Sequence, residues 1–476
     1  MAKITAVIDI GSNSITLKIY KKTSRLAFYE LHRLKYKIKI GEGSYENGGV
    51  LQKLPMQRAY EALRDFSYII KAYKARKTLC VATSALRDAP NKKEFIKRVD
   101  CELGIKIKVI DGKKESEFGA ISAINLLWKM DSFTTIDIGG GSTEFAKVER
   151  GKVVKRTSLQ LGHVRLNEKF KSDSEKLEYI NKELEKLDDD FFDRRVVAIG
   201  GSARELSKFI QKKESYPLKC LHGYRYEFEK SKKQLEKLLE YDEKKLKKYI
   251  SKNRIDSIKD GDLIFLKSLE KLGCKEVIVN QKGVREGVYL KDLLRSFNSK
   301  FPANFDLNLK VIEDRFIETP KVNSYLKRIA VSLSNTLLEG SEYDKIIGFC
   351  AKVLNILDFN FYSWIEYLDF SIVHEDKVLV AFLLHSYNNG ELDEELYEKF
   401  LLLLPSFDIL KKLFFVLELV DIIGKNMHIQ KFDIVKSDNI IEIVLEDISS
   451  MSIDEIERLD NPTIYKIKVK SGRKSI

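Results

Sequence analysis

Two segments far apart in the chain share one pattern, and this repeat constrains the fold more than any other feature of the sequence. Residues 6–14 and residues 135–144 each consist of an apolar strand, an aspartate near its end, and a turn of glycine and serine. The residues after each turn, 15–20 and 145–148, keep the near-alternating pattern of a strand. Each segment therefore predicts a β-hairpin with a tight turn. Two such hairpins indicate duplicated halves that face each other across a cleft.

The composition of the two turns suits phosphate binding. Both hairpins run from strand to strand, which excludes a Walker P-loop and a dinucleotide fingerprint, because those motifs run from a strand into a helix. Successive backbone N–H groups of a Gly/Ser turn can converge on phosphate oxygens, and hydroxyls add donors. One hairpin alone is more often a simple tight turn, whereas the matched pair favours a clamp on a polyphosphate. The predicted phosphate-binding residues of the turns are Gly11, Ser12, Asn13, Ser14, Gly139, Gly140, Gly141, Ser142 and Thr143.

Carboxylates beside the two turns suit a metal ion. Asp9 and Asp137 occupy matching positions near the ends of their strands, where a carboxylate would hold Mg²⁺ through water close to a bound phosphate. Glu144 is a third candidate ligand. We therefore predict Mg²⁺, or Mn²⁺ in its place, as the cofactor.

The pattern of apolar residues and glycines changes twice along the rest of the chain. Strand and helix patterns alternate through the first part, with capping boxes predicted at residues 91–94 and at Ser202 with Glu205. After about residue 300 glycine becomes scarce and apolar residues recur at helical spacing, as at residues 326–337, which predicts a separate helical domain. Alternating apolar residues at 440–445 and 465–469 then predict strands in a small closing element.

Composition limits the class of protein. The chain has 476 residues, a formal net charge of +13 and five widely spaced cysteines without a Cys-x-x-Cys pair, for which we expect buried reduced thiols. Charged residues interrupt the longest apolar stretch, residues 400–423, and no secretory signal precedes the first strand, so we expect a cytoplasmic protein without a membrane span. The positive charge suits a polyanionic partner. Because the basic residues form no Arg-rich tail and no zinc-finger spacing, we expect no dedicated nucleic-acid binding.

Five motifs in a fixed order resemble the exopolyphosphatase and guanosine pentaphosphate phosphohydrolase (Ppx/GppA) family. They are residues 9–14, 82–89, 137–144, 200–204 and 283–287, which together span most of residues 1–297. The resemblance implies an α/β fold of two actin-like (ribonuclease-H-like) domains facing a cleft, followed by a mostly helical C-terminal domain. The implied divisions are a first actin-like domain at 1–125, a second at 126–300 whose last helix returns to the first, a helical HD-like domain at 301–425 and a small α/β element at 426–476.

The resemblance implies roles for an arginine and for a glycine-rich loop. Arg87 matches the arginine of the family's Ala-Thr-Ser-x-x-Arg segment, and a planar guanidinium can bind a phosphate through two hydrogen bonds. Without the family, a surface salt bridge to Asp88 would be the favoured interpretation. Gly200, Gly201 and Ser202 correspond to the loop where actin-like ATPases hold adenosine, and here they would serve a phosphate chain or a guanosine.

The family's catalytic acid lies in a Gly-x-Glu-Glu-Ala segment, which corresponds here to residues 112–116. Glu115 aligns with the second of the paired glutamates, which implies that it is the general base that activates water. On the sequence alone, an acid in the first turn of a helix is the favoured interpretation. Lys114 stands where the family has its first glutamate, and Glu117 is a second choice for the base.

The C-terminal helical region resembles the HD-type domain of longer family members. None of the six histidines is followed directly by aspartate, so the metal pair of HD enzymes is absent. His374, Glu375, Asp376 and His385 do not specify a metal site by themselves. We expect this domain to bind substrate, dimerise or regulate.

Together these features predict a Mg²⁺-dependent phosphohydrolase. It would release terminal phosphate from inorganic polyphosphate, or from the 5′ end of guanosine pentaphosphate to leave guanosine tetraphosphate. Two alternatives stay open: a catalytically weak sensor of these polyanions, suggested by Lys114, and an actin-like ATPase or sugar kinase that shares both hairpins. We also expect a homodimer and no membrane partner.

Overall fold

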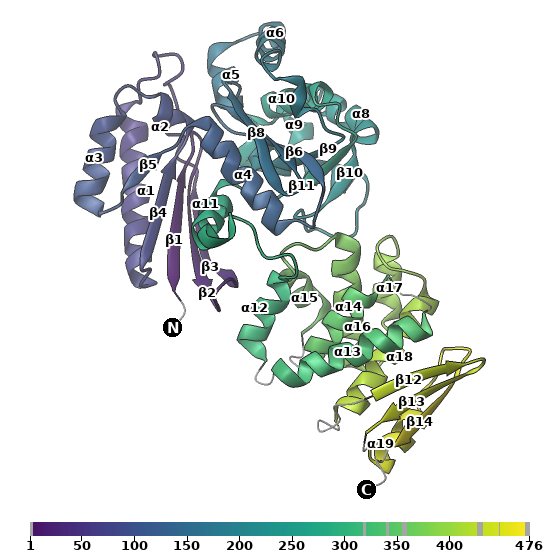
Figure 1. The fold of residues 1–476 in the computed structure, drawn as a ribbon. Helices are drawn as coiled ribbons and strands as arrows, with labels where there is room; N and C mark the ends of the chain where they lie inside the picture. Colours follow the sequence, from purple (N-terminus) through teal and green to yellow (C-terminus); the bar gives the residue numbers. More distant parts are fainter. Residues whose placement is uncertain are drawn as a thin grey trace. The chain divides into compact units, whose positions relative to one another are not determined.

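The computed structural model describes residues 3–317, 320–338, 342–354, 359–425, 432–446 and 448–471. The chain forms two compact units, Met1–Leu307 and Asn308–Ile476. Both hairpin segments and the other three motifs lie in the first unit, which consists of two α/β lobes (Figure 1). The division into four domains, with boundaries at residues 125, 300 and 425, stays a prediction.

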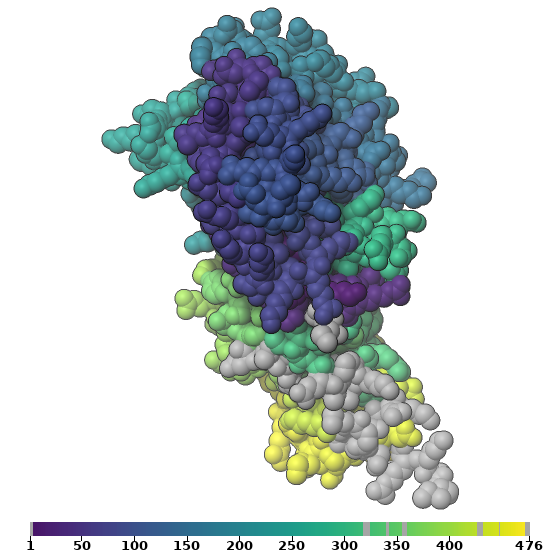
Figure 2. Space-filling model, turned by 90° about the vertical axis from the view of Figure 1, so that its left-hand side faces the viewer, coloured from purple at the N-terminus to yellow at the C-terminus, as the bar shows by residue number. Residues whose placement is uncertain are grey.

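The first lobe is a five-stranded mixed sheet with helices on its outer face. The strand order is β3-β2-β1-β4-β5, in which β1 to β3 are antiparallel neighbours and β4 and β5 continue parallel to β1. Apolar side chains of β1 and β2 pack with those of α1 and α3 in one core, and Figure 2 views the lobe from the side of these helices. The elements are β1 (Ile4–Ile10), β2 (Ile15–Lys22), β3 (Phe28–Tyr36), α1 (Lys53–Ala72), β4 (Lys77–Ala82), α2 (Ser84–Asp88), α3 (Lys92–Leu103) and β5 (Ile107–Val109).

The second lobe repeats this topology. Its sheet has the order β10-β11-β9-β6-β7-β8, so the run β8-β7-β6-β9-β11 matches β3-β2-β1-β4-β5 and β10 is an additional edge strand. The strands are β6 (Ser132–Ile138), β7 (Thr143–Glu149), β8 (Lys152–Leu159), β9 (Arg195–Ile199), β10 (Arg225–Glu227) and β11 (Glu276–Val279). The helices are α4 (Gly112–Leu126), α5 (His163–Lys169), α6 (Asp173–Leu184), α7 (Gly200–Lys213), α8 (Phe228–Leu239), α9 (Glu243–Leu246), α10 (Ile258–Lys271) and α11 (Val284–Leu293), with 3₁₀ turns at Asp189–Phe191, Lys252–Arg254 and Arg295–Phe297.

Both predicted hairpins are present, and their turns close in the same way. The N–H of Gly11 donates to the Ser14 carbonyl at 3.1 Å, and the N–H of Gly139 donates to the Ser142 carbonyl at 2.9 Å. In each hairpin the first strand also pairs in parallel with a later strand, β1 with β4 and β6 with β9. The duplication inferred from the sequence is therefore confirmed at the level of strand order and turn geometry.

Two helices connect the lobes. Apolar residues of α4, such as Ala120 and Ala123, pack in one core with residues of β6, β7 and β9. Helix α11 contacts α4 and also β1 of the first lobe (Figure 1). Its Tyr289 stacks on Tyr20 of β2 with ring centroids 4.5 Å apart. The site between the lobes is therefore flanked by helices that contact both halves.

The two predicted capping boxes do not form. Helix α3 begins after Asn91, but the Asn91 side chain bonds the backbone of Leu51 in both directions, at 3.0 and 2.9 Å, instead of capping the helix. Helix α7 begins at Gly200, two residues before Ser202, and Glu205 accepts hydrogen bonds from the N–H and hydroxyl of Ser251. In both places a tertiary partner uses the side chain that the local pattern assigned to the cap.

The second unit is helical and ends in a small sheet. Helices α12 (Leu307–Phe316), α13 (Pro320–Leu337), α14 (Asp344–Val353), α15 (Phe361–Tyr367), α16 (His374–Asn389), α17 (Glu394–Phe400) and α18 (Phe407–Gly424) precede β12 (Phe432–Ser437), β13 (Ile440–Leu445), α19 (Ser450–Glu457) and β14 (Lys466–Ser471). The sheet order is β12-β13-β14. The predicted helical region and closing strands are thus present.

Two expectations from the composition concern membrane-spanning helices and the cysteines. Among the helices that the structure describes, none combines the length and the apolar character needed to cross a bilayer. All five cysteines are free, and Cys80, Cys274 and Cys350 are buried. Cys101 is exposed and Cys220 only half-buried, so the expectation of buried thiols was wrong for these two. Cys101 lies in the last turn of α3, on the side of that helix away from its two buried residues, Phe95 and Val99.

Candidate active site

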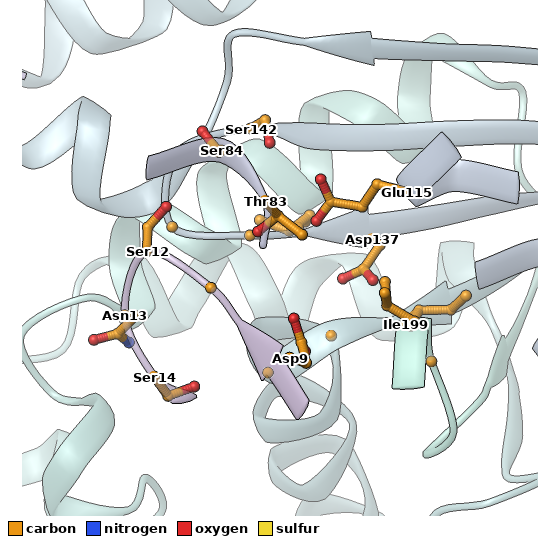
Figure 3. Close-up of a pocket in the computed structure, with 18 of the residues that line it drawn as sticks. Asp9, Ser12, Asn13, Ser14, Thr83, Ser84, Glu115, Asp137, Ser142 and Ile199 are labelled. Atoms are coloured by element: carbon orange, nitrogen blue, oxygen red, sulfur yellow. The ribbon is translucent and has the colours of Figure 1, made fainter. Parts of the chain in front are cut away.

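One pocket lies where the parallel strands of both lobes end. In such sheets the segments that follow the carboxyl ends of the strands meet at one edge. The turns after β1 and β6, the starts of α2, α4 and α7, and the segment before α11 all reach this pocket (Figure 3). It is lined by Asp9, Gly11, Ser12, Asn13, Ser14, Lys35, Thr83, Ser84, Glu115, Asp137, Ile138, Gly139, Gly140, Gly141, Ser142, His163, Ile199, Gly200, Gly201, Arg204, Arg254, Gln281, Gly283, Val284 and Arg285.

The two turns face each other across this pocket. A β-carbon on Gly140 would lie 3.0 Å from the β-carbon of Ser12, so the turns approach each other closely only because Gly140 has no side chain. The second turn is held from behind by α5, since the N–H groups of Val164 and Arg165 donate to the Gly140 carbonyl at 2.8 and 3.1 Å. This confirms the predicted arrangement of two similar halves facing a cleft.

Most of the residues predicted for the site line the pocket, and four do not. The lining residues among them are Asp9, Gly11, Ser12, Asn13, Ser14, Glu115, Asp137, Gly139, Gly140, Gly141, Ser142, Gly200 and Gly201. Of the other four, Thr143 donates its hydroxyl to the Leu161 carbonyl, and Ser202 is buried in α7, facing Gly261. Glu144 is buried one layer behind the wall, where it accepts from Ser158 at 2.8 Å. These positions leave Thr143 and Ser202 without direct access to a ligand.

Arg87 is the fourth residue that does not line the pocket. Its guanidinium donates to Glu115 Oε2 at 3.0 Å and to Ser142 Oγ at 3.2 Å, and both of those residues do line it. The arginine also lies 3.6 Å from Asp88, the partner expected from the sequence alone. Arg87 therefore joins the first turn of α4 to the turn after β6, and it acts on the site through its two partners.

Glu115 is held in an acidic and mostly buried environment. Burial raises its pKa well above the usual range, the Glu144 carboxyl raises it further, and Arg87 opposes both effects. Burial also raises the pKa of Asp137 to about 6 and that of Glu144 to about 7. Figure 3 shows Glu115 and Asp137 pointing into the same part of the pocket. A group with a raised pKa at this position can accept a proton near neutral pH.

Asp9 has a different partner from the other carboxylates. It accepts a hydrogen bond from Arg285 Nη1 at 2.8 Å, and both side chains are mostly buried. Burial raises the pKa of Asp9, while Arg285 lowers it. Within the described ranges, no three His, Cys, Asp or Glu side chains converge closely enough to coordinate a metal directly. Asp137 lines the pocket and could hold a hydrated cation there, whereas Glu144 is buried behind the wall.

Lys114, the departure from the family pattern, points away from the pocket. Its ammonium lies 3.0 Å from Glu117, and Glu117 also accepts from Lys291 at 2.6 Å and from Arg156. Lys114 is not a lining residue. Glu117, the second choice for the base, is thus the centre of an ion-pair cluster that ties α4 to β8 and α11.

The sequence predicted no role for the basic residues that form one wall of the pocket. Lys35, Arg204, Arg254 and Arg285 all line it, and none was assigned a role. Arg204 and Arg285 lie within quoted motifs, so their place in those motifs was the available signal. Lys35 and Arg254 come from a strand and a 3₁₀ turn without any motif.

Charge on this wall is only partly neutralised. Burial and neighbouring arginines together lower the pKa of Lys35 to about 7 and that of Arg204 to about 10. His163 also lines the pocket, and burial lowers its pKa to about 3, so the imidazole is neutral at physiological pH. A bound anion would stabilise the cations of this wall.

Comparison with known proteins gives a consistent result. The model of the Ppx/GppA phosphatase family matches residues 18–296, more than half of the chain. A bifunctional 3-dehydroquinate synthase/phosphatase of Fusobacterium nucleatum is 30% identical over 309 residues, which cover 63% of this chain and 44% of that protein. The chain spans about half the length of the curated relatives it matches.

Solved structures agree with the fold. The crystal structure of the Aquifex aeolicus member of the Ppx/GppA family is 28% identical, with a TM-score of 0.54, and the match covers 62% of this chain and 99% of that one. An exopolyphosphatase from Cytophaga hutchinsonii has a TM-score of 0.57 at 20% identity, covering 63% of this chain and all of that one, which supports the fold alone. These matches have the two actin-like domains that the sequence implied.

Proposed function

The chain belongs to the Ppx/GppA phosphatase family, and on that premise we propose that its first unit is a phosphohydrolase that releases the terminal phosphate of a phosphoanhydride chain. The proposed substrates are inorganic polyphosphate and the 5′ end of guanosine pentaphosphate. One observation carries the proposal: two matching Gly/Ser turns meet around a single pocket into which Glu115 points. Backbone N–H groups and hydroxyls on two sides suit a phosphate group, and the basic wall suits the rest of a polyanion.

Glu115 would act as the general base. Its carboxylate accepts a proton from a water molecule as that water attacks the terminal phosphorus. The bond from this phosphorus to the bridging oxygen breaks, and the shortened chain leaves with the negative charge. Donors of the two turns stabilise the equatorial phosphate oxygens, where charge is spread in the transition state. Arg87 keeps the Glu115 carboxylate and the Ser142 hydroxyl in place through its hydrogen bonds at 3.0 and 3.2 Å.

The proposed cofactor is Mg²⁺ or Mn²⁺. Asp137 would hold the ion through water from the pocket wall, and Glu144 would add negative charge from behind that wall. Asp9 would be a weaker contributor because Arg285 already occupies its carboxylate. When bound, the ion would neutralise charge on the phosphate oxygens. Its positive charge would also favour ionised Asp137 and Glu144, whose pKa values burial raises.

The geometry of Lys114 supports the hydrolase over a catalytically weak sensor. The sensor was suggested because a lysine replaces the first glutamate of the family's pair. That lysine pairs with Glu117 outside the pocket and does not obstruct Glu115.

Phosphate release by the purified protein tests the proposal. Long-chain polyphosphate, guanosine pentaphosphate and ATP would be compared at equal concentration with Mg²⁺, with Mn²⁺ and with excess EDTA. We expect release from one or both of the first two substrates, little from ATP, and none with EDTA. Faster release from ATP would instead favour an actin-like ATPase. Tight binding of a polyanion without any release would favour the sensor.

A further inference from the structure

Tyr45 brings a phenol hydroxyl to the back of the phosphate turns. It lies in the loop between β3 and α1 and is 8% exposed. Its hydroxyl donates to Ser12 Oγ at 3.1 Å and lies beside the Ser84 hydroxyl, which donates to Asp88 at 3.5 Å. Ser12 and Ser84 line the pocket, whereas Tyr45 does not. Its influence on a ligand therefore passes through these two serines.

The same hydroxyl also packs against the opposite turn. A β-carbon on Gly141 would lie 2.0 Å from the Tyr45 hydroxyl oxygen and 2.4 Å from Ser84 Oγ. Only glycine leaves room for that oxygen at this position. One hydroxyl thus touches three lining residues, which follow β1, β4 and β6 respectively.

Contacts from the second lobe fix the Tyr45 side chain and its loop. The Arg165 guanidinium lies over the ring, 4.5 Å from its centroid, and donates to the Gly141 carbonyl at 2.7 Å. Arg165 also donates to Asp88 at 2.8 Å. Glu168 accepts from the backbone N–H groups of Gly43 and Tyr45 at 3.1 and 3.3 Å. A loop of the first lobe is therefore held against α5 of the second.

We propose that Tyr45 is a positioning residue that orients the Ser12 hydroxyl, packs against Ser84 and holds the two turns together as one phosphate site. A serine hydroxyl can either donate or accept. Because Tyr45 donates to Ser12 Oγ, the proton of Ser12 is directed to another acceptor, and a phosphate oxygen in the pocket is such an acceptor. This inference depends on one part of the proposed function, namely that the two turns bind phosphate.

The variant Tyr45→Phe tests the proposal, because it removes the hydroxyl and keeps the ring under Arg165. We expect the Kd for inorganic orthophosphate, measured by phosphorus NMR, to rise about threefold to tenfold, which is the range for one lost hydrogen bond. KM for the hydrolysed substrate should rise by a similar factor with kcat nearly unchanged, as expected for an interaction present in both ground and transition states. The melting temperature should stay close to that of the unsubstituted protein.

Two further variants separate positioning from general packing. Tyr60→Phe removes another tyrosine hydroxyl of the first lobe, which donates to Glu102 at 2.6 Å. Because neither Tyr60 nor Glu102 lines the pocket, this variant should change neither Kd nor KM. In a Ser12→Ala background, Tyr45→Phe should have a smaller effect than alone, because its partner is gone.

An unchanged Kd and KM for Tyr45→Phe, or full additivity with both Ser12→Ala and Ser84→Ala, would overturn the proposal. Absence of orthophosphate binding by the unsubstituted protein would also overturn it. The protein could hydrolyse none of the three substrates while Tyr45→Phe still weakens orthophosphate binding. That result would uphold the positioning role and contradict the proposed function instead.

Discussion

At the scale of single residues, the site depends on carboxyl groups that differ in their surroundings. Asp9 is paired with Arg285, whereas burial raises the pKa values of Glu115, Asp137 and Glu144. The Asp137 carboxyl also raises the pKa of Glu115 and of Glu144, and Glu144 raises that of Glu115. Arg87 is the cation that Glu115 contacts directly. A base in such surroundings keeps its proton to a higher pH than an exposed glutamate does.

This environment leads to a prediction for the pH dependence of kcat/KM. Glu115 works as a base only when it is deprotonated, and its pKa lies well above 4.5. Activity should therefore fall as the pH is lowered through that raised pKa, so that the acid limb of the profile lies well above pH 4.5. Steady-state rates across a pH series, at saturating metal, measure it. An acid limb at or below pH 4.5 would show that Glu115 is not the titrating base.

How far residue roles could be predicted depended on where their partners come from. The turn residues could be predicted from their local motifs, whereas the role of Glu115 as a base was implied only by the family resemblance. Arg87 was expected to bind phosphate, but in the structure it contacts Glu115 and Ser142 behind the pocket wall. Lys114 was a reason to consider a sensor, but its partner is Glu117, one helical turn away. Lys35 and Arg254 could not be predicted, because only the packing of distant segments brings them to the pocket.

At the scale of elements, a cluster of buried polar residues at the start of α11 fixes this helix beside the pocket. Glu286 accepts from the Gly283 N–H at 2.7 Å and from the Tyr20 hydroxyl at 2.8 Å, and it pairs with Lys18 at 2.7 Å. Burial opposes its ionisation, but Lys18 and Arg285 outweigh that effect and hold its pKa well below the usual range. This cluster fixes the helix that carries Arg285 against the first sheet.

Glu286→Gln should therefore destabilise the first unit by about 3 kcal/mol at pH 7, as expected when one partner of a buried ion pair is removed. The carboxylate stabilises the fold above the pH of its unfolded pKa, about 4.3, and this contribution is lost as the pH falls through the lower folded pKa. The difference from the unsubstituted protein should shrink over that window.

Urea denaturation at pH 7 and at a series of pH values below about 4.3 measures this difference. Glu227→Gln is a matched control, because Glu227 is exposed and pairs only with the exposed Lys230 in the described structure. A loss of stability that does not change with pH would contradict the ionised role of Glu286.

The elements themselves were predictable where the pattern was local and repeated. Both hairpins form as expected, because strand alternation and Gly/Ser turns specify them without distant partners. The capping boxes at Asn91 and Ser202 did not form, since Asn91 bonds Leu51 and α7 starts two residues earlier. Local signals therefore gave the element type more reliably than its termini.

At the scale of the whole molecule, net charge and the basic wall of the pocket favour a long polyanion. The formal net charge is +13, and the basic side chains of Lys35, Arg204, Arg254 and Arg285 line the pocket beside the turns. Electrostatic attraction of a polyanion weakens as salt screens it. The duplicated topology places this wall and the turns in the same pocket.

We therefore expect kcat/KM for long-chain polyphosphate to fall about tenfold or more between roughly 0.05 M and 0.5 M NaCl. Tripolyphosphate carries fewer charges, so its kcat/KM should fall less. Parallel salt series with the two substrates provide the comparison. Equal salt dependence for both would contradict attraction of the chain beyond its terminal phosphate.

The most direct test of the account compares Glu115→Gln with Glu94→Gln on the preferred substrate. Both residues lie in the first turn of a helix, α4 and α3, but only Glu115 lines the pocket. We expect Glu115→Gln to lower kcat by about 10² to 10⁴ with KM changed little, which is the usual contribution of a general base, while Glu94→Gln should behave as the unsubstituted protein. An unchanged kcat for Glu115→Gln would contradict the general-base role.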